Sequence, residues 1–171
     1  MSTGLSAQEL LAAGRAPRRR LATPLELRLD DAVTYELEDY VVRGILIYFA
    51  GSRQWRVYQL NDGKQERWLE VRGEGVDVAW FELQAATSVP PDESVALEGH
   101  TFTVRETGSA SLDVESEAGR RAGVFVEYRN YRSADGQRLT VETWPDAGRV
   151  LLGKGIQADE LDLWTKPPTT E

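Results

Sequence analysis

Polar and apolar residues alternate with a period of two over most of the chain from residue 25 onward, and helical periodicity is nearly absent. Turn residues interrupt the alternation, and a Pro-Pro segment at residues 87–92 divides it into two halves. Strands are predicted at residues 33–37, 40–49, 53–60, 65–72 and 76–83, and again at 101–106, 111–115, 122–131, 138–144 and 150–152. Segment 40–49 is apolar on both faces apart from Arg43, which predicts a central, covered strand. The pattern therefore predicts an all-β, mainly antiparallel fold.

The two halves share residues at a constant spacing, which indicates an internal repeat. At one offset of 73 residues, Trp55-x-x-Tyr58 matches Tyr128-x-x-Tyr131, and Asp62-Gly63 matches Asp135-Gly136. Glu70 matches Glu142 only at an offset of 72, which requires a deletion of one residue. We expect a duplicated β domain at residues 25–165, with related blocks at about residues 25–86 and 96–165. These blocks would share one core as a sandwich or as a pair of half-barrels.

The first 24 residues form an N-terminal arm in this pattern. Ser6 and Glu9 have the spacing of a capping box and Gly14 is a typical helix stop, so a short helix is predicted at residues 7–13. Four arginines in residues 1–22 oppose Glu9 alone, a local charge of +3 that leaves −11 on the remainder of the chain. We expect a helical, basic arm that acts as a tether, and a short tail at residues 166–171.

Composition and charge restrict the cellular compartment and the classes of partner that we expect for the protein. The chain has 171 residues, no cysteine and a net charge of −8. An acidic surface repels nucleic-acid phosphates, so no nucleic-acid partner is expected. The longest apolar run, residues 45–50, is far shorter than the roughly 20 residues that span a bilayer. The N-terminus also lacks the order of charged and apolar residues found in a secretory leader. The sequence therefore predicts a cytoplasmic protein without a membrane span.

Motifs of the common enzyme classes are absent from the sequence. The only histidine, His100, has no G-x-S-x-G nucleophile motif to accompany it. The lack of cysteine removes thiol catalysis and Cys-ligated metals. Gly153-Lys154-Gly155 lacks the full spacing of a phosphate-binding loop and is predicted to be a turn. We therefore expect no catalytic residue, cofactor or metal, although an enzyme that uses carboxylates alone stays open.

One constellation joins tryptophans to carboxylates. The apolar positions of segment 65–72 mark one face, which places Trp68 and Glu70 together on the opposite, charged face. The same alternation in segment 138–144 places Glu142 and Trp144 on a charged face. An exposed tryptophan beside carboxylates suits a cation, so these four residues are candidate ligand-binding residues. The alternative is that the two tryptophans are covered by another strand, by the arm or by stacked arginines.

Several of these features resemble the bacterial domain-of-unknown-function family 4178. They are the apolar strand at 40–49, Trp55-x-x-Tyr58, Trp68-Leu69 after Asp62-Gly63, residues 101–104, Gly119, Tyr128-x-x-Tyr131, Glu142-x-Trp144 and Gly153. The likeness covers about residues 25–160. It implies no established activity and no catalytic residues. It implies genomic proximity to a phage-shock-type membrane coat protein, to small membrane proteins and to a polyamine-synthase-like enzyme.

These observations predict a non-enzymatic cytoplasmic accessory or binding module. Through the resemblance, we expect it to act with a membrane-associated stress system by contacts with another protein. The alternative is a binder of a small cation such as a polyamine, or a domain associated with an enzyme. The patterns leave the oligomeric state open.

Overall fold

The computed structural model describes residues 18–84 and 88–166, and these residues are built mainly of strands. The strands are β1 (Ala32–Tyr35), β2 (Glu38–Ala50), β3 (Arg53–Asn61), β4 (Glu66–Arg72), β5 (Asp77–Leu83), β6 (Ser94–Leu97), β7 (His100–Ser116), β8 (Gly119–Ser133), β9 (Gln137–Thr143), β10 (Gly148–Ile156) and β11 (Asp162–Trp164). Three short 3-10 turns complete the described part: η1 (Pro24–Glu26), η2 (Gly73–Gly75) and η3 (Ala158–Glu160). No helix in this part is long and apolar enough to cross a membrane. The helix predicted at residues 7–13 lies outside the described residues.

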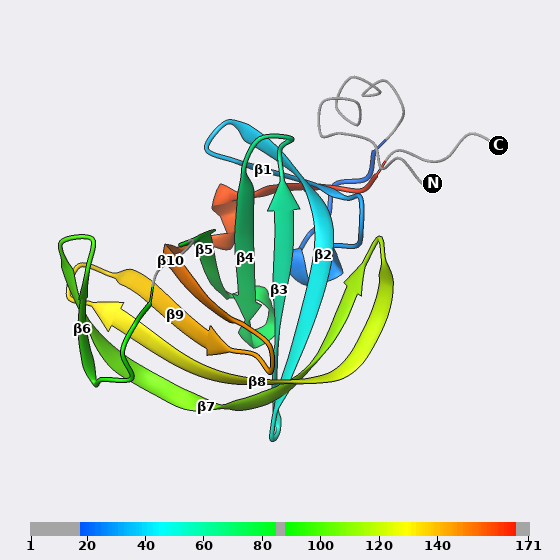
Figure 1. Cartoon of the computed structure of the whole chain (residues 1–171). Helices are drawn as coiled ribbons and strands as arrows, with labels where there is room; N and C mark the ends of the chain where they lie inside the picture. Colours follow the sequence, from blue (N-terminus) through cyan, green and yellow to red (C-terminus); the bar gives the residue numbers. More distant parts are fainter. Residues whose placement is uncertain (1–17, 85–87, 167–171) are drawn as a thin grey trace.

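Eight strands close into a ring. β2 to β5 are hydrogen-bonded in chain order, as are β7 to β10, and the β5–β10 and β2–β7 pairs join these two meanders (Figure 1). β1 and β11 extend the sheet beside β2, and β6 pairs with one end of β7. Every strand pair in the described part is antiparallel, which confirms the predicted fold class. The two meanders form paired half-barrels rather than a sandwich.

β2 is the central strand that its apolar pattern predicts, because it pairs with β1, β3 and β7. The strands predicted at 101–106 and 111–115 are instead one strand, β7, of 17 residues. Its register against β8 shifts between Val104 and Glu106 and again between Leu112 and Val114. At the first shift Arg105 is an extra residue in β7 and displaces the alternation of its faces, and at the second shift the extra residue lies in β8.

The Gly153-Lys154-Gly155 segment lies within β10 and not in the predicted turn. A Cβ atom at Gly153 would lie 1.8 Å from the carbonyl oxygen of Trp80 on the neighbouring strand β5. Glycine is needed here because the two backbones approach each other too closely for any side chain.

The positions that suggested a repeat occupy equivalent elements of the two meanders. Trp55 lies on the second strand of the first meander and Tyr128 on the second strand of the other. Gly63 and Gly136 adopt positive φ values of 97° and 87° in the turns that follow those strands. The rings of Trp55 and Tyr128 meet inside the ring of strands with their centroids 5.3 Å apart. These placements fit a duplication, whose common ancestry stays a prediction.

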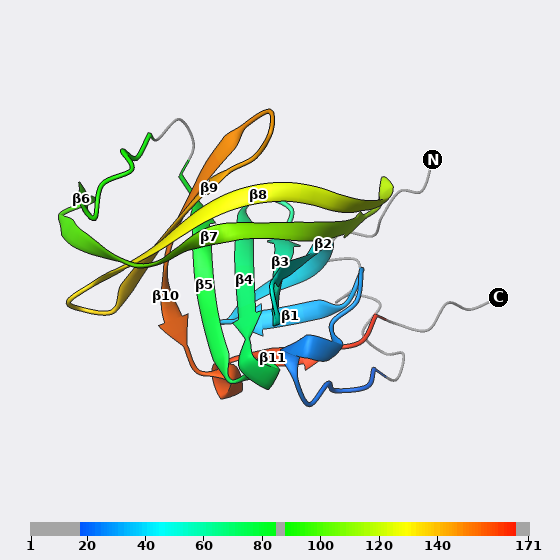
Figure 2. The same cartoon turned by 90° about the horizontal axis from the view of Figure 1, so that it is seen from below.

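The outer face of the first meander is covered by both ends of the described chain. Apolar residues of β3, β4 and β5, among them Leu69 and Val71, pack against Leu21, Leu27 and Leu163. The backbone N–H of Leu21 donates to the carbonyl oxygen of Leu163 at 2.9 Å. Figure 2 shows η1, β1 and β11 grouped on one side of the molecule, opposite β6. Residues 18–24, predicted as part of a tether, therefore belong to the packed fold, since burying a leucine contributes about 1.5–3 kcal/mol.

The outer face of the second meander has its own cover. Leu139 and Val141 of β9 pack with Phe102 of β7 and with Val95 of β6. The segment before β6 crosses the same face, where the hydroxyl of Tyr131 donates to the carbonyl oxygen of Asp92 at 2.9 Å. The apolar faces of both meanders are thus buried outside the ring, and the opposite faces line its interior.

Candidate functional site

The charged faces of β4 and β9 point into the ring and not to solvent. Trp68, Glu70 and Glu142 are only 7%, 8% and 4% exposed. The expectation that Trp68 and the two carboxylates lie on an exposed outer face is therefore wrong. Alternation identifies the residues that share a face, but the segments that cover the outer faces determine which face becomes the interior.

A cation does lie between the two tryptophans, and it belongs to the chain itself. The guanidinium carbon of Arg149 on β10 lies 4.4 Å from the ring centroid of Trp68 and 5.3 Å from that of Trp144. Its Nε donates to Glu142 at 2.9 Å, and one terminal nitrogen donates to the Tyr48 hydroxyl at 2.7 Å. We call these five residues the arginine cage. A polyamine at this place would have to displace Arg149.

The arginine cage holds its charges by mutual compensation. Burial lowers the pKa of Arg149, but the nearby carboxylate of Glu142 outweighs burial and the pKa is raised overall. Burial and then the same carboxylate raise the pKa of the Tyr48 hydroxyl well above its ordinary value. Arg149 therefore stays charged and Tyr48 stays neutral, so Tyr48 can donate a hydrogen bond to Glu142 at 2.8 Å. Within the described residues, the buried Nε1 of Trp68 has no hydrogen-bond partner.

Glu70, the fourth candidate residue, forms its ion pair outside the arginine cage. Its carboxylate pairs with Arg72 at 3.0 Å, and the guanidinium of Arg72 stacks on Trp55 with its carbon 4.2 Å from the ring centroid. Glu106 of β7 lies on the other side of this group and pairs with Arg53 at 2.5 Å and with Arg72 at 3.7 Å. This second polar network leads from the interior toward an open cavity.

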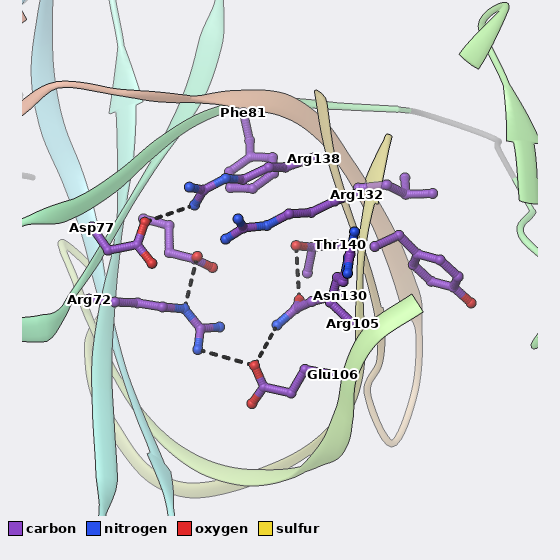
Figure 3. Close-up of a pocket in the computed structure, with 12 residues that line it drawn as sticks. Arg72, Asp77, Phe81, Arg105, Glu106, Asn130, Arg132, Arg138 and Thr140 are labelled. Atoms are coloured by element: carbon purple, nitrogen blue, oxygen red, sulfur yellow. Dashed lines mark hydrogen bonds and ion pairs between the residues drawn. The ribbon is translucent and has the colours of Figure 1, made fainter. Parts of the chain in front are cut away.

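The cavity has a volume of about 140 Å³ and is rich in arginine. Figure 3 shows it between β4, β5, β7, β8 and β9. Its charged lining residues are Arg72, Arg105, Arg132 and Arg138, against Glu70, Asp77 and Glu106. We call this pocket the arginine cavity. It is positively charged although the protein as a whole has a net charge of −8.

Two of these arginines have a carboxylate partner and two have none. Arg138 pairs with Asp77 at 3.0 Å, and Arg72 pairs with Glu70. Among the described residues, the side chains of Arg105 and Arg132 form no hydrogen bond or ion pair, although the backbone of Arg132 belongs to paired strands. Figure 3 shows the guanidinium of Arg132 directed into the cavity beside that of Arg138. The cavity therefore presents donors that no group of the described chain uses.

Local backbone structure places these arginines. Arg132 and Arg138 are directly opposite each other across the β8–β9 hairpin. Like charges at opposed positions are unfavourable unless a counter-charge lies between them. Arg105 is the extra residue at the β7 irregularity, and it lines the cavity together with its neighbour Glu106. Extra residues of this kind redirect side chains and are common beside functional sites.

The alternative that stacked arginines cover the two tryptophans is confirmed, but sequence reasoning did not identify Arg149 and missed the arginine cavity, although the hairpin turns contained signals. Turn residues at 145–148 place Arg149 opposite Glu142. The Asp135-Gly136 turn likewise places Arg132 opposite Arg138. Testing each predicted hairpin for opposed charges would have found one ion pair and one like-charge pair. The contribution of Arg105 depends on an irregularity that the sequence does not reveal.

The single histidine of the sequence pairs with one acidic residue. His100, at the start of β7, lies 3.1 Å from a carboxylate oxygen of Asp135 in the following hairpin. Among residues 18–84 and 88–166, no group of three His, Cys, Asp or Glu side chains is arranged to hold a metal ion.

Comparison with known proteins identifies the family of this chain. Uncharacterized protein Rv2597 of Mycobacterium tuberculosis (strain ATCC 25618 / H37Rv) is 29% identical over 141 residues, which cover 77% of this chain and 68% of the relative. Uncharacterized protein Mb2628 of Mycobacterium bovis matches with the same identity and coverage. No solved structure matches the chain. The model of the domain of unknown function DUF4178 matches residues 28–158. The protein therefore belongs to the DUF4178 family.

Proposed function

We propose that the protein is a non-enzymatic binding module whose arginine cavity holds an anionic group, a carboxylate or a phosphate, of its ligand. One observation carries the proposal. Arg132 and Arg138 face each other across a hairpin, but within residues 18–84 and 88–166 only Arg138 has a carboxylate partner, and Arg132 points into the cavity. An anion between them would supply the missing counter-charge.

The chemistry of the cavity suits such a group. Guanidinium donors match the geometry of carboxylate and phosphate oxygens, and their charge-assisted hydrogen bonds are about twice as strong as neutral ones. Asn130 and Thr140 also line the cavity and add polar contacts. A volume of about 140 Å³ is below the roughly 300–1,000 Å³ of pockets that enclose whole small molecules. The cavity is therefore suited to one charged group of a ligand and not to an entire metabolite.

The hydrogen bonds that the interior side chains already make with one another support a binding role for the arginine cavity. Tyr48, Glu142 and Arg149 are bonded to one another, and burial keeps them from solvent. Such a network orders the interior. The donors of the arginine cavity then remain as the polar groups available to a ligand. Action with a membrane-associated stress system, through contacts with another protein, stays a prediction of the family resemblance.

Calorimetric titration with inorganic phosphate and with glutarate tests the proposal. We expect saturable binding at low ionic strength, and a loss of at least tenfold in affinity for Arg132→Gln, because this variant removes the unpaired donor. The matched control is Arg121→Gln, an exposed arginine near the far end of β8 that makes the same charge change away from the cavity. Absence of saturable binding by both anions, or equal affinity in the Arg132→Gln variant, would reject the proposal.

A further inference from the structure

One edge of β7 is open for six residues. Toward β6, the strand is paired up to Val104, whose N–H donates to the carbonyl oxygen of Glu93 at 2.9 Å. Toward the other end, pairing with β2 begins at Ser111, opposite Phe49. Residues 105–110 between these points have no strand partner on this edge among the described residues, although β8 pairs along their other edge. Figure 1 shows this stretch of β7 running between β6 and the β2–β3 hairpin.

The open edge adjoins the arginine cavity. Its first two residues, Arg105 and Glu106, line the cavity. Arg53, 57% exposed at the start of β3, reaches the same place through its ion pair with Glu106. A chain laid along residues 105–110 would therefore pass the cavity at one end.

We infer that an extended acidic segment of a partner protein pairs with residues 105–110 of β7 as an added strand and inserts one carboxylate into the arginine cavity. This inference rests on the proposed function and names the source of the anionic group. Main-chain hydrogen bonds to an exposed sheet edge supply affinity without sequence preference, and pockets for alternate side chains supply specificity. Six paired residues span about 20 Å, and every second side chain of the added strand faces the same side.

The chemistry of the edge favours this occupant. Residues 107–110 are Thr-Gly-Ser-Ala, without the proline or lysine that proteins use to block exposed edges. Thr107 and Ser109 are small and exposed, so the backbone around them is accessible, whereas Ala110, at the β2 end of the open edge, is buried. Arg53, Arg105 and Arg132 give this end of β7 a positive field, which attracts carboxylates and repels a basic segment. A second copy of the chain is the competing occupant, and the experiment separates the two.

The probe is an acetylated and amidated hexapeptide of alternating glutamate and serine, compared with glutarate, a free dicarboxylate without a peptide backbone. We expect the peptide to bind at least tenfold more tightly than glutarate. It should also slow hydrogen exchange at the amides of residues 105–110. Two further peptides carry N-methyl groups on alternate residues. One is methylated at the odd-numbered positions and the other at the even-numbered positions. One of them should lose binding and the other keep it, because only every second N–H of a strand faces its partner.

The outcomes separate the inference from the proposed function. If glutarate binds through Arg132 but the peptide binds no more tightly and leaves residues 105–110 unprotected, the added strand is wrong and the anion site stands. If both N-methylated peptides bind equally, side chains alone hold the peptide and the added strand is again wrong. If neither peptide nor glutarate binds, the proposed function fails. If the protein alone dimerises and protects residues 105–110, the occupant is a second copy and the inference is overturned.

Discussion

Replacing Arg149 by methionine should destabilise the protein more than any change to a surface ion pair. Methionine keeps an unbranched side chain that reaches about as far as the Nε position, but it removes the guanidinium and its charge between Trp68 and Trp144. Glu142, which is 4% exposed, would then lose its ion-pair partner, and among the described residues only Tyr48 and Trp144 would remain as its hydrogen-bond donors. An uncompensated buried carboxylate is the dominant cost of the substitution.

The structure sets the expected magnitude. The Arg149 side chain is 13% exposed and Glu142 is 4% exposed, so solvent screens their attraction little. Removing one partner of such a pair costs about 3–5 kcal/mol, which includes the burial of the remaining charge. The double variant Arg149→Met with Glu142→Leu removes both charges and leaves only neutral donors without partners. It should lie about 1–3 kcal/mol below the wild type, the cost of unsatisfied polar groups.

Urea unfolding measures these differences. The single variants should lower the midpoint without changing the slope, and the cycle should give a coupling energy of at least about 2 kcal/mol. Arg20→Met is the matched control, because Arg20 pairs with Asp162 at 2.8 Å on the surface and should change stability by less than about 1 kcal/mol. A loss below about 1 kcal/mol for Arg149→Met, or additive effects in the cycle, would refute the role assigned to the arginine cage.

Three further predictions concern other parts of the ring. Gly153→Ala should lower the free energy of unfolding by about 3 kcal/mol or more in urea titration, because the new Cβ would overlap the Trp80 backbone; a loss under 1 kcal/mol would contradict this reasoning. Burial raises the pKa of Glu106, but hydrogen bonds from a tyrosine and an arginine outweigh burial and lower the pKa below its ordinary 4.5. Its ionised form therefore stabilises the fold above that value, and this stability is lost as the pH falls. Between about pH 5 and 3 the free energy of unfolding should fall more for the wild type than for Glu106→Gln. Parallel curves of this free energy against pH would show that Glu106 contributes nothing. Spermidine at millimolar concentration should not quench tryptophan fluorescence saturably, because Arg149 occupies the cation position, and saturable quenching would instead support the polyamine alternative.

The strands could be predicted because their signal is local. Period-two alternation and turn dipeptides such as Asp62-Gly63 depend on neighbouring residues, and they place most strands and the antiparallel class correctly. Closure of the ring depends on pairs such as Phe49 with Ser111 and Leu83 with Leu151, which are remote in sequence. No local pattern encodes these pairings, so the choice between a sandwich and half-barrels stayed open.

The same local reasoning predicts only part of the candidate site. Alternation correctly grouped Trp68 with Glu70, and Glu142 with Trp144, as residues that share a face. The orientation of those faces depends on what covers the opposite side. Leu21 comes from the predicted tether, and Val95 lies between the two predicted blocks. The sequence left open whether a face with tryptophan and glutamate is exposed or covered, because carboxylates are rarely buried unless arginines pair with them.

Compensation of charge distinguishes the two polar regions of the ring. In the arginine cage, Arg149 and Glu142 cancel each other's charge, and the Nε and one terminal nitrogen of the guanidinium donate to Glu142 and Tyr48. Around the arginine cavity, five arginines, if Arg53 is included, face three carboxylates, which leaves an excess of two positive charges at Arg105 and Arg132. A net charge of −8 repels anions over the molecule as a whole, but screening limits that repulsion to roughly 8–10 Å at physiological ionic strength. An anion that reaches the cavity therefore experiences the local excess, and because each guanidinium adds one charge, a group with two negative charges gains more there than a group with one.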